Sequence, residues 1–444
     1  MVAQPRTEDS LRRMVLGPGL MVLARVGGAL AAMGFTMLLT RSMGAAAMSE
    51  VSVAISLAMV LALGCTLNIE EGAVRFMVQD ITAGRFAAAM GYVRFGRRLI
   101  ALACLGVVLI GGAVLWWLGT PLTSPLFLAL LAAPVLGWMR LGAGLALGFG
   151  RPVASVLPRT LLRPVFMVIL VGLWLALVGT PSPWVATLLF VATCLAALTV
   201  QGLLLSPDLT ALDRNLGAEA PDTARSRDWV KVGLTLGLGV LFVEYSIYLT
   251  VLFGALVLSP ADTARLDVLL KLIALLRFST AAINQYFSPR MSRAMGQTNL
   301  PALERLIALS GAMRLAILLV GGLGIALLGP PVLGLFGPEF AGDGGLLLLL
   351  LGDIALITLF GPGANVVGYS NRPHAMLPVL LAALVVMVGG TVALGQVWGL
   401  TGVIVAVLVT RAVWTGGAAI AARRIAGIDT TILSLPRYLT GRRA

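Results

Sequence analysis

The sequence has few charged residues. Only 11% of its 444 residues are Asp, Glu, Lys or Arg, whereas 59% are hydrophobic. A water-facing surface needs charged side chains, but here the charges stand in short clusters between long apolar runs. About 20 apolar residues suffice for a helix to cross the hydrocarbon core of a bilayer. The scarcity of charge therefore excludes a soluble domain of this length and predicts a polytopic helical membrane protein.

Lysine, histidine and cysteine are also rare. Neither of the two lysines follows a glycine, so the chain lacks the Gly-Lys-Ser/Thr phosphate loop of many ATPases. The single histidine, His374, stands in a polar turn, and a histidine-based metal centre is not expected. Cys65, Cys104 and Cys194 lie in apolar runs, where cysteine behaves as a small core hydrophobe rather than as a disulfide or zinc ligand. No metal and no cofactor are therefore expected.

The apolar runs predict about twelve transmembrane helices, because open strands cannot satisfy their backbone groups in lipid. The predicted spans lie near residues 17–40, 48–69, 98–119, 125–147, 160–180, 184–205, 232–258, 266–287, 306–328, 344–367, 375–397 and 400–421. The fold class is therefore an all-α polytopic membrane protein.

The longest polar segment, Ser206–Trp229, stands near the middle of the chain and leaves six predicted spans on each side. The two halves also share a local pattern, since Arg75–Met77 and Pro289–Met291 follow corresponding spans. Such repeats are typical of secondary transporters, whose substrate cavity lies between the halves. The predicted organisation is a six-helix lobe over 1–205, a cytoplasmic linker over 206–231, a second six-helix lobe over 232–422 and a cytoplasmic tail over 423–444.

The net charge of +13 is carried almost entirely by arginine. Arg and Lys gather in alternate loops, and this asymmetry places both termini in the cytoplasm. We expect the basic residues to contact lipid headgroups rather than nucleic acid. The outer loops, such as Gly119–Ser124, are short. Short outer loops count against a membrane enzyme such as a polysaccharide polymerase or ligase, which needs room to hold a sugar acceptor.

Four stretches carry a resemblance to a known family, in their order and spacing along nearly the whole chain. They are Leu38–Gly44, Phe287–Ser292, Leu333–Phe340 and Trp398–Val403. With them the chain resembles the polysaccharide-exporter (Wzx-type) branch of the multidrug/oligosaccharidyl-lipid/polysaccharide (MOP) flippase superfamily.

The resemblance implies twelve helices in two lobes around a central cavity that opens to one side of the membrane at a time, without use of ATP. It implies a flippase of the bacterial inner membrane that moves undecaprenyl-pyrophosphate-linked oligosaccharide to the outer leaflet for polysaccharide export. The expected partners are this lipid-linked substrate, membrane lipids and other polysaccharide-assembly proteins.

Ionisable residues inside the spans are costly and are therefore functional candidates. The candidates for substrate binding are Arg25, Arg277, Lys271, Arg140 and Arg41. A guanidinium group can donate two parallel hydrogen bonds to a phosphate, which suits a pyrophosphate linker. Three of the candidates also have a structural interpretation: Arg25 can stand at a close helix contact, Arg277 in an internal ion pair, and Lys271 beside Asp267, four residues before it.

Glu244 and Asp353 are the candidates for coupling transport to a proton or sodium gradient. A carboxylate desolvated in a span takes up a proton more readily. The alternative for each is an ion pair with a basic residue, in the case of Glu244 with Arg25, Lys271 or Arg277. Basic residues outnumber carboxylates within the spans, which favours an anionic substrate over a cationic drug. A cation-coupled multidrug exporter of the same superfamily remains the alternative function, ahead of a polymerase or ligase.

Overall fold

The chain is helical throughout the part that the structure describes. A computed structural model describes residues 7–370 and 372–434, with side chains described from Leu23 onward except at positions 238 and 373. Within these residues the structure contains helices and turns but no strand. The predicted fold class is confirmed.

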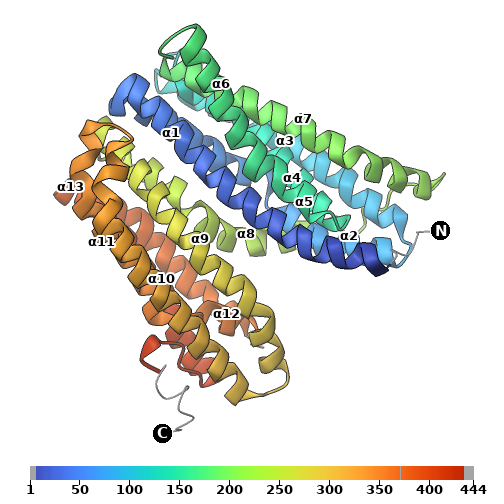
Figure 1. The fold of residues 1–444 in the computed structure, drawn as a ribbon. Coiled ribbons are helices and arrows are strands. Elements are labelled where there is room, and N and C mark those ends of the chain that lie inside the picture. The colour runs from blue at the N-terminus through green and yellow to red at the C-terminus, as the bar shows by residue number, and fades with distance from the viewer. Residues whose placement is uncertain (1–6, 371, 435–444) are drawn as a thin grey trace. The chain divides into compact units, whose positions relative to one another are not determined.

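The chain divides into two compact units, Met1–Tyr248 and Leu249–Ala444. The helices of the first unit are drawn from blue to green in Figure 1. They are α1 (Thr7–Thr66), the 3-10 helix η1 (Ile69–Gly72), α2 (Ala73–Thr82), α3 (Phe86–Trp117), α4 (Pro125–Gly148), α5 (Pro152–Leu157), the π-helix η2 (Pro158–Leu162), α6 (Arg163–Leu177), α7 (Pro183–Leu216) and most of α8 (Ser226–Gly254).

Helix α4 forms the centre of the first unit. It packs against α1, α3 and α7. In its most apolar 18-residue stretch 67% is buried, compared with 11% in the corresponding stretch of α3. Small residues allow this close packing. A Cβ atom at Gly137, for example, would lie 3.1 Å from Cβ of Cys65 on α1. The apolar side chains of α4 thus face protein, whereas many of those on α3 face outward.

The second unit is built around three long helices and one shorter helix. They are α9 (Pro260–Gly296), α10 (Leu300–Gly334), α11 (Gly344–Phe360) and α13 (Met376–Ala426). Short elements connect them: η3 (Pro338–Asp343), α12 (Gly363–Gly368), η4 (Pro373–Ala375) and η5 (Ile432–Ser434). Helix α10 packs against α9 and α11, and α11 packs against α13.

Two of the helices contain a glycine with a non-helical backbone. Gly44 in α1 has φ 80° and Gly399 in α13 has φ 56°, a region that residues with a Cβ rarely adopt. Eight helices of the described chain are long and apolar enough to cross a membrane, or nine when the bent halves of α8 count as one span. Dividing α1 and α13 at these glycines and adding the more polar α9 gives about twelve spans.

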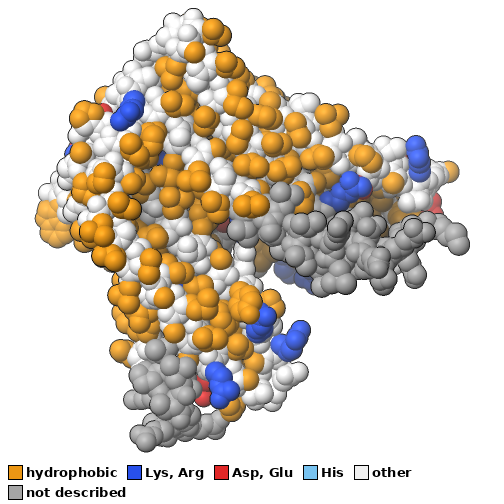
Figure 2. All heavy atoms as spheres, in the orientation of Figure 1, with side chains coloured by type: hydrophobic (Ala, Val, Ile, Leu, Met, Phe, Trp, Pro, Cys, Tyr) orange, Lys and Arg blue, Asp and Glu red, His pale blue; other side chains and the backbone are white. Residues whose placement is uncertain are grey.

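Large apolar side chains lie on the outer faces of the helices in both units. Leu102 on α3 and Val385 on α13 are 70% and 71% exposed, and hydrophobic side chains cover the long sides of the helices in Figure 2. Apolar patches of this extent mark surfaces that face something other than water. With the length and apolarity of the helices, they make this a multi-pass membrane protein.

The segment around the predicted linker is largely helical. Helix α7 continues past Leu205 to Leu216, and α8 begins at Ser226. Helix α8, which the sequence analysis assigned to the second lobe, contributes residues to both compact units. The predicted tail starts in the last turn of α13, and its residues 435–444 lie outside the described part of the chain.

We predict that Gly28→Ala destabilises the protein because α1 touches the π-helical turn backbone to backbone. A Cβ atom at Gly28 would lie 1.7 Å from the carbonyl oxygen of Thr160. Overpacking of this kind typically costs about 1–3 kcal/mol. Thermal unfolding of the purified protein in detergent measures the loss. The control is Gly106→Ala on α3, where no atom lies within 4 Å of the new methyl group, so its Tm should stay the same or rise. Equal effects of the two substitutions would contradict the close contact.

Candidate functional site

The first buried polar cluster of the protein lies where α1 ends. Leu67 and Asn68 have positive φ angles of 46° and 58°, so the helix cannot continue past Thr66. The Thr66 hydroxyl holds the break, since it accepts from the backbone N–H of Asn68 at 3.1 Å and lies 3.3 Å from Glu70 Oε1. The chain then turns into the short η1, which carries Glu70 and Glu71.

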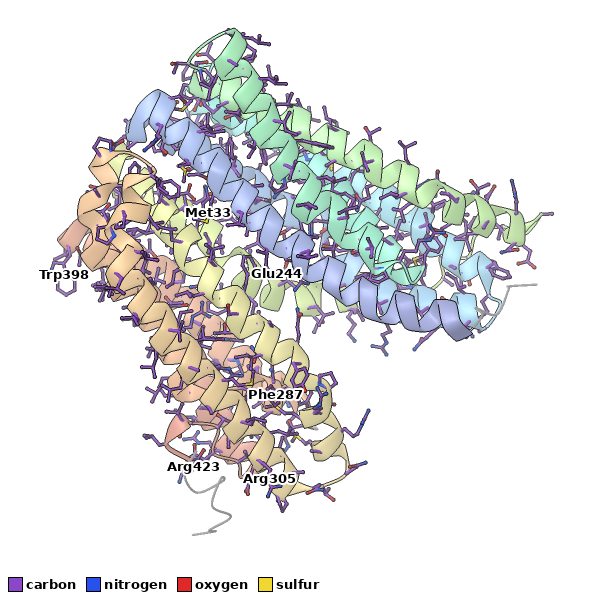
Figure 3. The ribbon with its side chains drawn as sticks, in the orientation of Figure 1. Met33, Glu244, Phe287, Arg305, Trp398 and Arg423 are labelled. Carbon is purple, nitrogen blue, oxygen red and sulfur yellow. The ribbon has the colours of Figure 1, made fainter. Side chains whose placement is uncertain are left out.

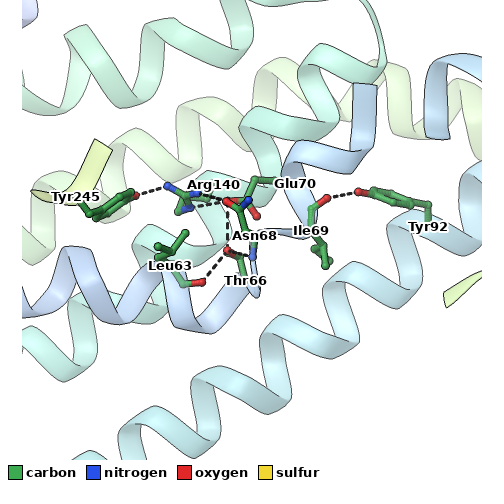
Figure 4. Close-up of polar contacts among 8 residues, drawn as sticks. All are labelled: Leu63, Thr66, Asn68, Ile69, Glu70, Tyr92, Arg140 and Tyr245. Carbon is green, nitrogen blue, oxygen red and sulfur yellow. Dashed lines mark hydrogen bonds and ion pairs between the residues drawn. The ribbon is translucent and has the colours of Figure 1, made fainter. Parts of the chain in front are cut away.

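Arg140 of α4 reaches into this break and uses all three of its side-chain nitrogens (Figure 4). Its Nε donates to Glu70 Oε1 at 2.6 Å, its Nη2 donates to Asn68 Oδ1 at 3.0 Å, and its Nη1 donates to the hydroxyl of Tyr245 on α8. Arg140, Glu70 and Asn68 are 3%, 5% and 1% exposed. The cluster therefore joins α1, η1, α4 and α8 in the interior of the first unit.

Two glycines let the neighbouring helices come this close. A Cβ atom at Gly144 of α4 would lie 2.5 Å from the carbonyl oxygen of Glu70, and one at Gly233 of α8 would lie 2.6 Å from that of Leu67. Tyr92 of α3 also contacts the break, since its hydroxyl donates a hydrogen bond to the carbonyl oxygen of Ile69. Helices α3, α4 and α8 thus all meet the chain at the break.

Carboxylates gather around this cluster. Partial burial and the neighbouring charges of Glu70 and Glu244 raise the pKa of Glu71. Glu244 itself is exposed on α8 (Figure 3), and it has no hydrogen bond or ion pair with the described residues. The Glu244 carboxylate is therefore accessible to ions from outside the protein.

The second cluster lies in the second unit and centres on Asp353 of α11. This carboxylate is 0% exposed and accepts two hydrogen bonds, from Nε of Arg277 on α9 at 2.7 Å and from Nε of Arg411 on α13 at 2.6 Å. The two arginine side chains remain 17% and 16% exposed. Their Nη1 and Nη2 atoms have no hydrogen-bond partner among the described residues. One buried carboxylate thus joins three helices and holds two guanidinium groups side by side with donors to spare.

The charges near the start of α9 are paired locally. Lys271 Nζ lies 2.6 Å from Asp267 Oδ2, so the pairing of these two residues expected from their four-residue spacing is confirmed. Arg265 donates to Asp343 of η3 and to Asp262, the latter at 2.9 Å. These pairs lie nearer the start of α9 than the Asp353 cluster does.

The structure brings together only some of the residues singled out in the sequence. Arg277 and Asp353 are in direct contact, and Arg140 lies in the buried cluster of the first unit. Arg25 is half-buried on α1 without a partner among the described residues, and Arg41 is exposed on the same helix. Whether any of them contacts substrate stays a prediction.

Three contributors were missed in the sequence. Asn68 and Tyr245 carry no charge and gave no signal within their spans. Arg314, fully buried on α10, had a detectable signal as an arginine flanked by apolar residues.

Several solved structures share this arrangement of helices. A multidrug resistance MATE family transporter of the MOP superfamily, in an inward-facing conformation, aligns with a TM-score of 0.74 over 90% of this chain and 95% of its own, at 17% identity. The lipid II flippase MurJ, in an inward closed conformation, aligns with a TM-score of 0.68 over 95% and 91%, at 9% identity.

A third similar structure is a MOP superfamily transporter from Pyrococcus furiosus, described as having a binding pocket of reverse polarity. It aligns with a TM-score of 0.54 over 92% of this chain and 94% of its own, at 14% identity. The chain has the fold of these transporters. No protein-family model and no curated protein matches its sequence.

We predict that Arg140 and Glu70 stabilise the fold as a unit. Arg140→Met leaves the Glu70 carboxylate buried without its counter-charge, and breaking a buried pair in this way costs about 3–5 kcal/mol. The double variant Arg140→Met/Glu70→Met removes both charges and should recover most of the lost stability. Thermal unfolding of the four proteins in detergent completes the double-mutant cycle.

The matched control for this cycle is the more exposed pair of Arg151 and Asp208, which are 2.8 Å apart with 48% and 17% exposed side chains. Arg151→Met should cost no more than about 1 kcal/mol. If the stability losses of Arg140→Met and Glu70→Met simply added in the double variant, the two charges would not depend on each other. That outcome would contradict the ion pair seen in the structure.

Proposed function

We propose that this protein is a flippase of the MOP superfamily that moves undecaprenyl-pyrophosphate-linked oligosaccharide across the bacterial inner membrane by alternating access, for polysaccharide export. The observation that carries the proposal is the Asp353 cluster. Its two arginines are partly exposed, are held in place by a fully buried carboxylate, and keep free donors for an anionic ligand.

The geometry of the cluster suits a pyrophosphate. Arg277 and Arg411 bind opposite oxygens of one carboxylate through Nε, so their guanidinium groups are held a few ångströms apart. Each group has two outer nitrogens left, and a guanidinium donates parallel hydrogen bonds to phosphate oxygens. Two such groups match the two phosphates of the linker, while the prenyl chain stays in lipid.

The charge balance of the second unit supports an anionic substrate. Asp262, Asp267 and Asp343 pair with Arg265 and Lys271. Asp353 then binds both Arg277 and Arg411, and the buried Arg314 has no ion pair with a carboxylate of the described residues. Excess positive charge attracts a phosphorylated lipid and repels a cationic drug. The similarity in fold to a lipid II flippase is in keeping with a lipid-linked substrate.

Glu244 is our candidate for coupling transport to a proton or sodium gradient. It is exposed, it makes no hydrogen bond or ion pair with the described residues, and it lies near the carboxylate of Glu71. Asp353, the second residue considered for this role, accepts hydrogen bonds from two guanidinium groups, which favours a positioning role. Both termini are proposed to be cytoplasmic, where other polysaccharide-assembly proteins would have access to them.

A second function, cation-coupled multidrug export, is favoured by two observations. The fold aligns well with a multidrug resistance MATE family transporter, and Glu244 offers an exposed carboxylate that could bind a cationic drug. This function depends on Glu244 and not on the arginines around Asp353. Drug susceptibility of a deletion strain, and of the strain complemented with Glu244→Gln, separates the two.

We predict that a deletion strain accumulates a prenyl-pyrophosphate-linked oligosaccharide and loses the matching surface polymer. Complementation with Arg277→Gln or Arg411→Gln should reduce export by roughly 10- to 100-fold, because each substitution removes charge-assisted hydrogen bonds of about 1.5–3 kcal/mol. Mass spectrometry of extracted lipids measures the accumulated intermediate. Arg305→Gln, at an exposed arginine of α10 (Figure 3), is the control and should export normally. A normal lipid profile in the deletion strain would contradict the proposed substrate.

We further predict that Asp353 acts by positioning the two arginines. Asp353→Asn should reduce export to about the level of the arginine variants, since the neutral amide attracts the guanidinium groups less strongly. Asp353→Glu keeps the charge and should restore part of the activity. An Asp353→Asn protein that is folded, as judged by its Tm, and exports as well as the wild type would overturn this role.

A further inference from the structure

Arg314 is the most deeply buried arginine of the second unit and the least well satisfied. It lies on α10 with 1% of its surface exposed. Its Nη2 donates to Oδ1 of Asn284 on α9 at 2.5 Å, whereas its Nε and Nη1 have no hydrogen-bond partner. Two donor nitrogens of a charged group are therefore enclosed in the protein without an acceptor.

No carboxylate of the described chain neutralises this charge. Asp262 and Asp343 pair with Arg265, Asp267 pairs with Lys271, and Asp353 is shared by two other arginines. The remaining acidic residues of the unit, Glu304, Glu339 and Asp429, make no ion pair with Arg314 within the described residues. Among the described residues, the buried carboxylates of the unit are thus all bound to other basic residues, and none is left for Arg314.

Such an imbalance is costly in an apolar interior. Arginine stays protonated in proteins, so Arg314 cannot escape the cost by losing its proton. Burying an unpaired charge costs several kcal/mol, and buried donors are almost always hydrogen-bonded. The missing partner must supply negative charge and accept hydrogen bonds from Nε and Nη1.

We propose that Arg314 and Asn284 bind a small inorganic anion of the halide class between α9 and α10. The Asn284 side chain is half-buried, and its amide nitrogen provides a further donor beside the guanidinium. The site is closed, since Arg314 is 1% exposed and Ser310, one turn earlier on α10, is fully buried. A sugar-bearing pyrophosphate does not fit such a site, so this anion is distinct from the proposed transport substrate.

The anion acts as a counter-ion that stabilises the contact between α9 and α10. Arg277 lies on α9 seven residues before Asn284, about two turns away, so the bound ion also stabilises the helix that carries the proposed substrate site. The stability of the protein should therefore depend on halide concentration even without substrate.

The test is thermal unfolding of the purified full-length protein in detergent, in chloride or bromide compared with gluconate at constant ionic strength. The wild-type Tm should rise by roughly 1–2 °C for each tenfold increase in halide above its Kd. Asn284→Asp places a carboxylate where the amide contacts Arg314. This variant should have a raised Tm in gluconate and no halide dependence, because its own charge replaces the anion.

Arg314→Met should likewise lose the halide dependence, and in gluconate it should be at least as stable as the wild type because the uncompensated charge is gone. Arg305→Met, on the exposed surface of the same helix, should keep the full halide response. A wild-type Tm that does not respond to halide would overturn the proposal, and so would a response that persists in Arg314→Met. Neither outcome depends on transport of the lipid-linked substrate, so the inference can fail while the proposed function stands.

Discussion

A guanidinium group keeps its charge at physiological pH, so every arginine enclosed by apolar helices needs an acceptor. This constraint organises the interior of both units. In the first unit, Arg140 binds residues of η1 and α8 and the turn after α1, and it thereby joins segments that are about 70 to 105 residues apart. In the second unit, Asp353 joins α9, α11 and α13 through Arg277 and Arg411. In a membrane, lipid tails are as apolar as the helix surfaces, so helix association depends on close packing and on interhelical hydrogen bonds such as these.

The helices were predictable because the apolar runs are long, and the turns were predictable where glycine marks them. The resemblance motifs contain Gly44, Gly337 and Gly399, and each of these has a positive φ where one helix gives way to the next. Gly402 of the last motif is needed for a different reason, because a Cβ atom there would lie 1.9 Å from the carbonyl oxygen of Leu394. The extension of α7 beyond Leu205 was not predicted, because an apolar run ends at the membrane surface. A periodicity signal was present all the same, since Leu212 and Leu216 pack into the core of the first unit.

The polar clusters could be predicted only where the partners are close in sequence. Lys271 and Asp267 are one helical turn apart, and helix geometry alone brings them together. Arg277 and Asp353 are 76 residues apart, so both appeared in the sequence as costly charges but their contact depends on how α9 packs against α11. The Arg140 cluster was harder still, because neutral Asn68 and Tyr245 supply two of its acceptors and the strained backbone at Leu67 and Asn68 leaves little trace in composition.

The two arginine clusters differ in how many hydrogen-bond donors they leave free. This difference is why we assign a structural role to Arg140 and propose a ligand-binding role for Arg277 and Arg411. Arg140 has all three side-chain nitrogens bound and is almost fully enclosed, so it cannot exchange a partner for a substrate without breaking the core of its unit. Arg277 and Arg411 each commit only Nε to Asp353 and remain partly exposed. The proposed phosphate ligand would therefore bind the free nitrogens without competing with the carboxylate that holds the two arginines, which is why the proposed function places the substrate at this cluster and not at Arg140.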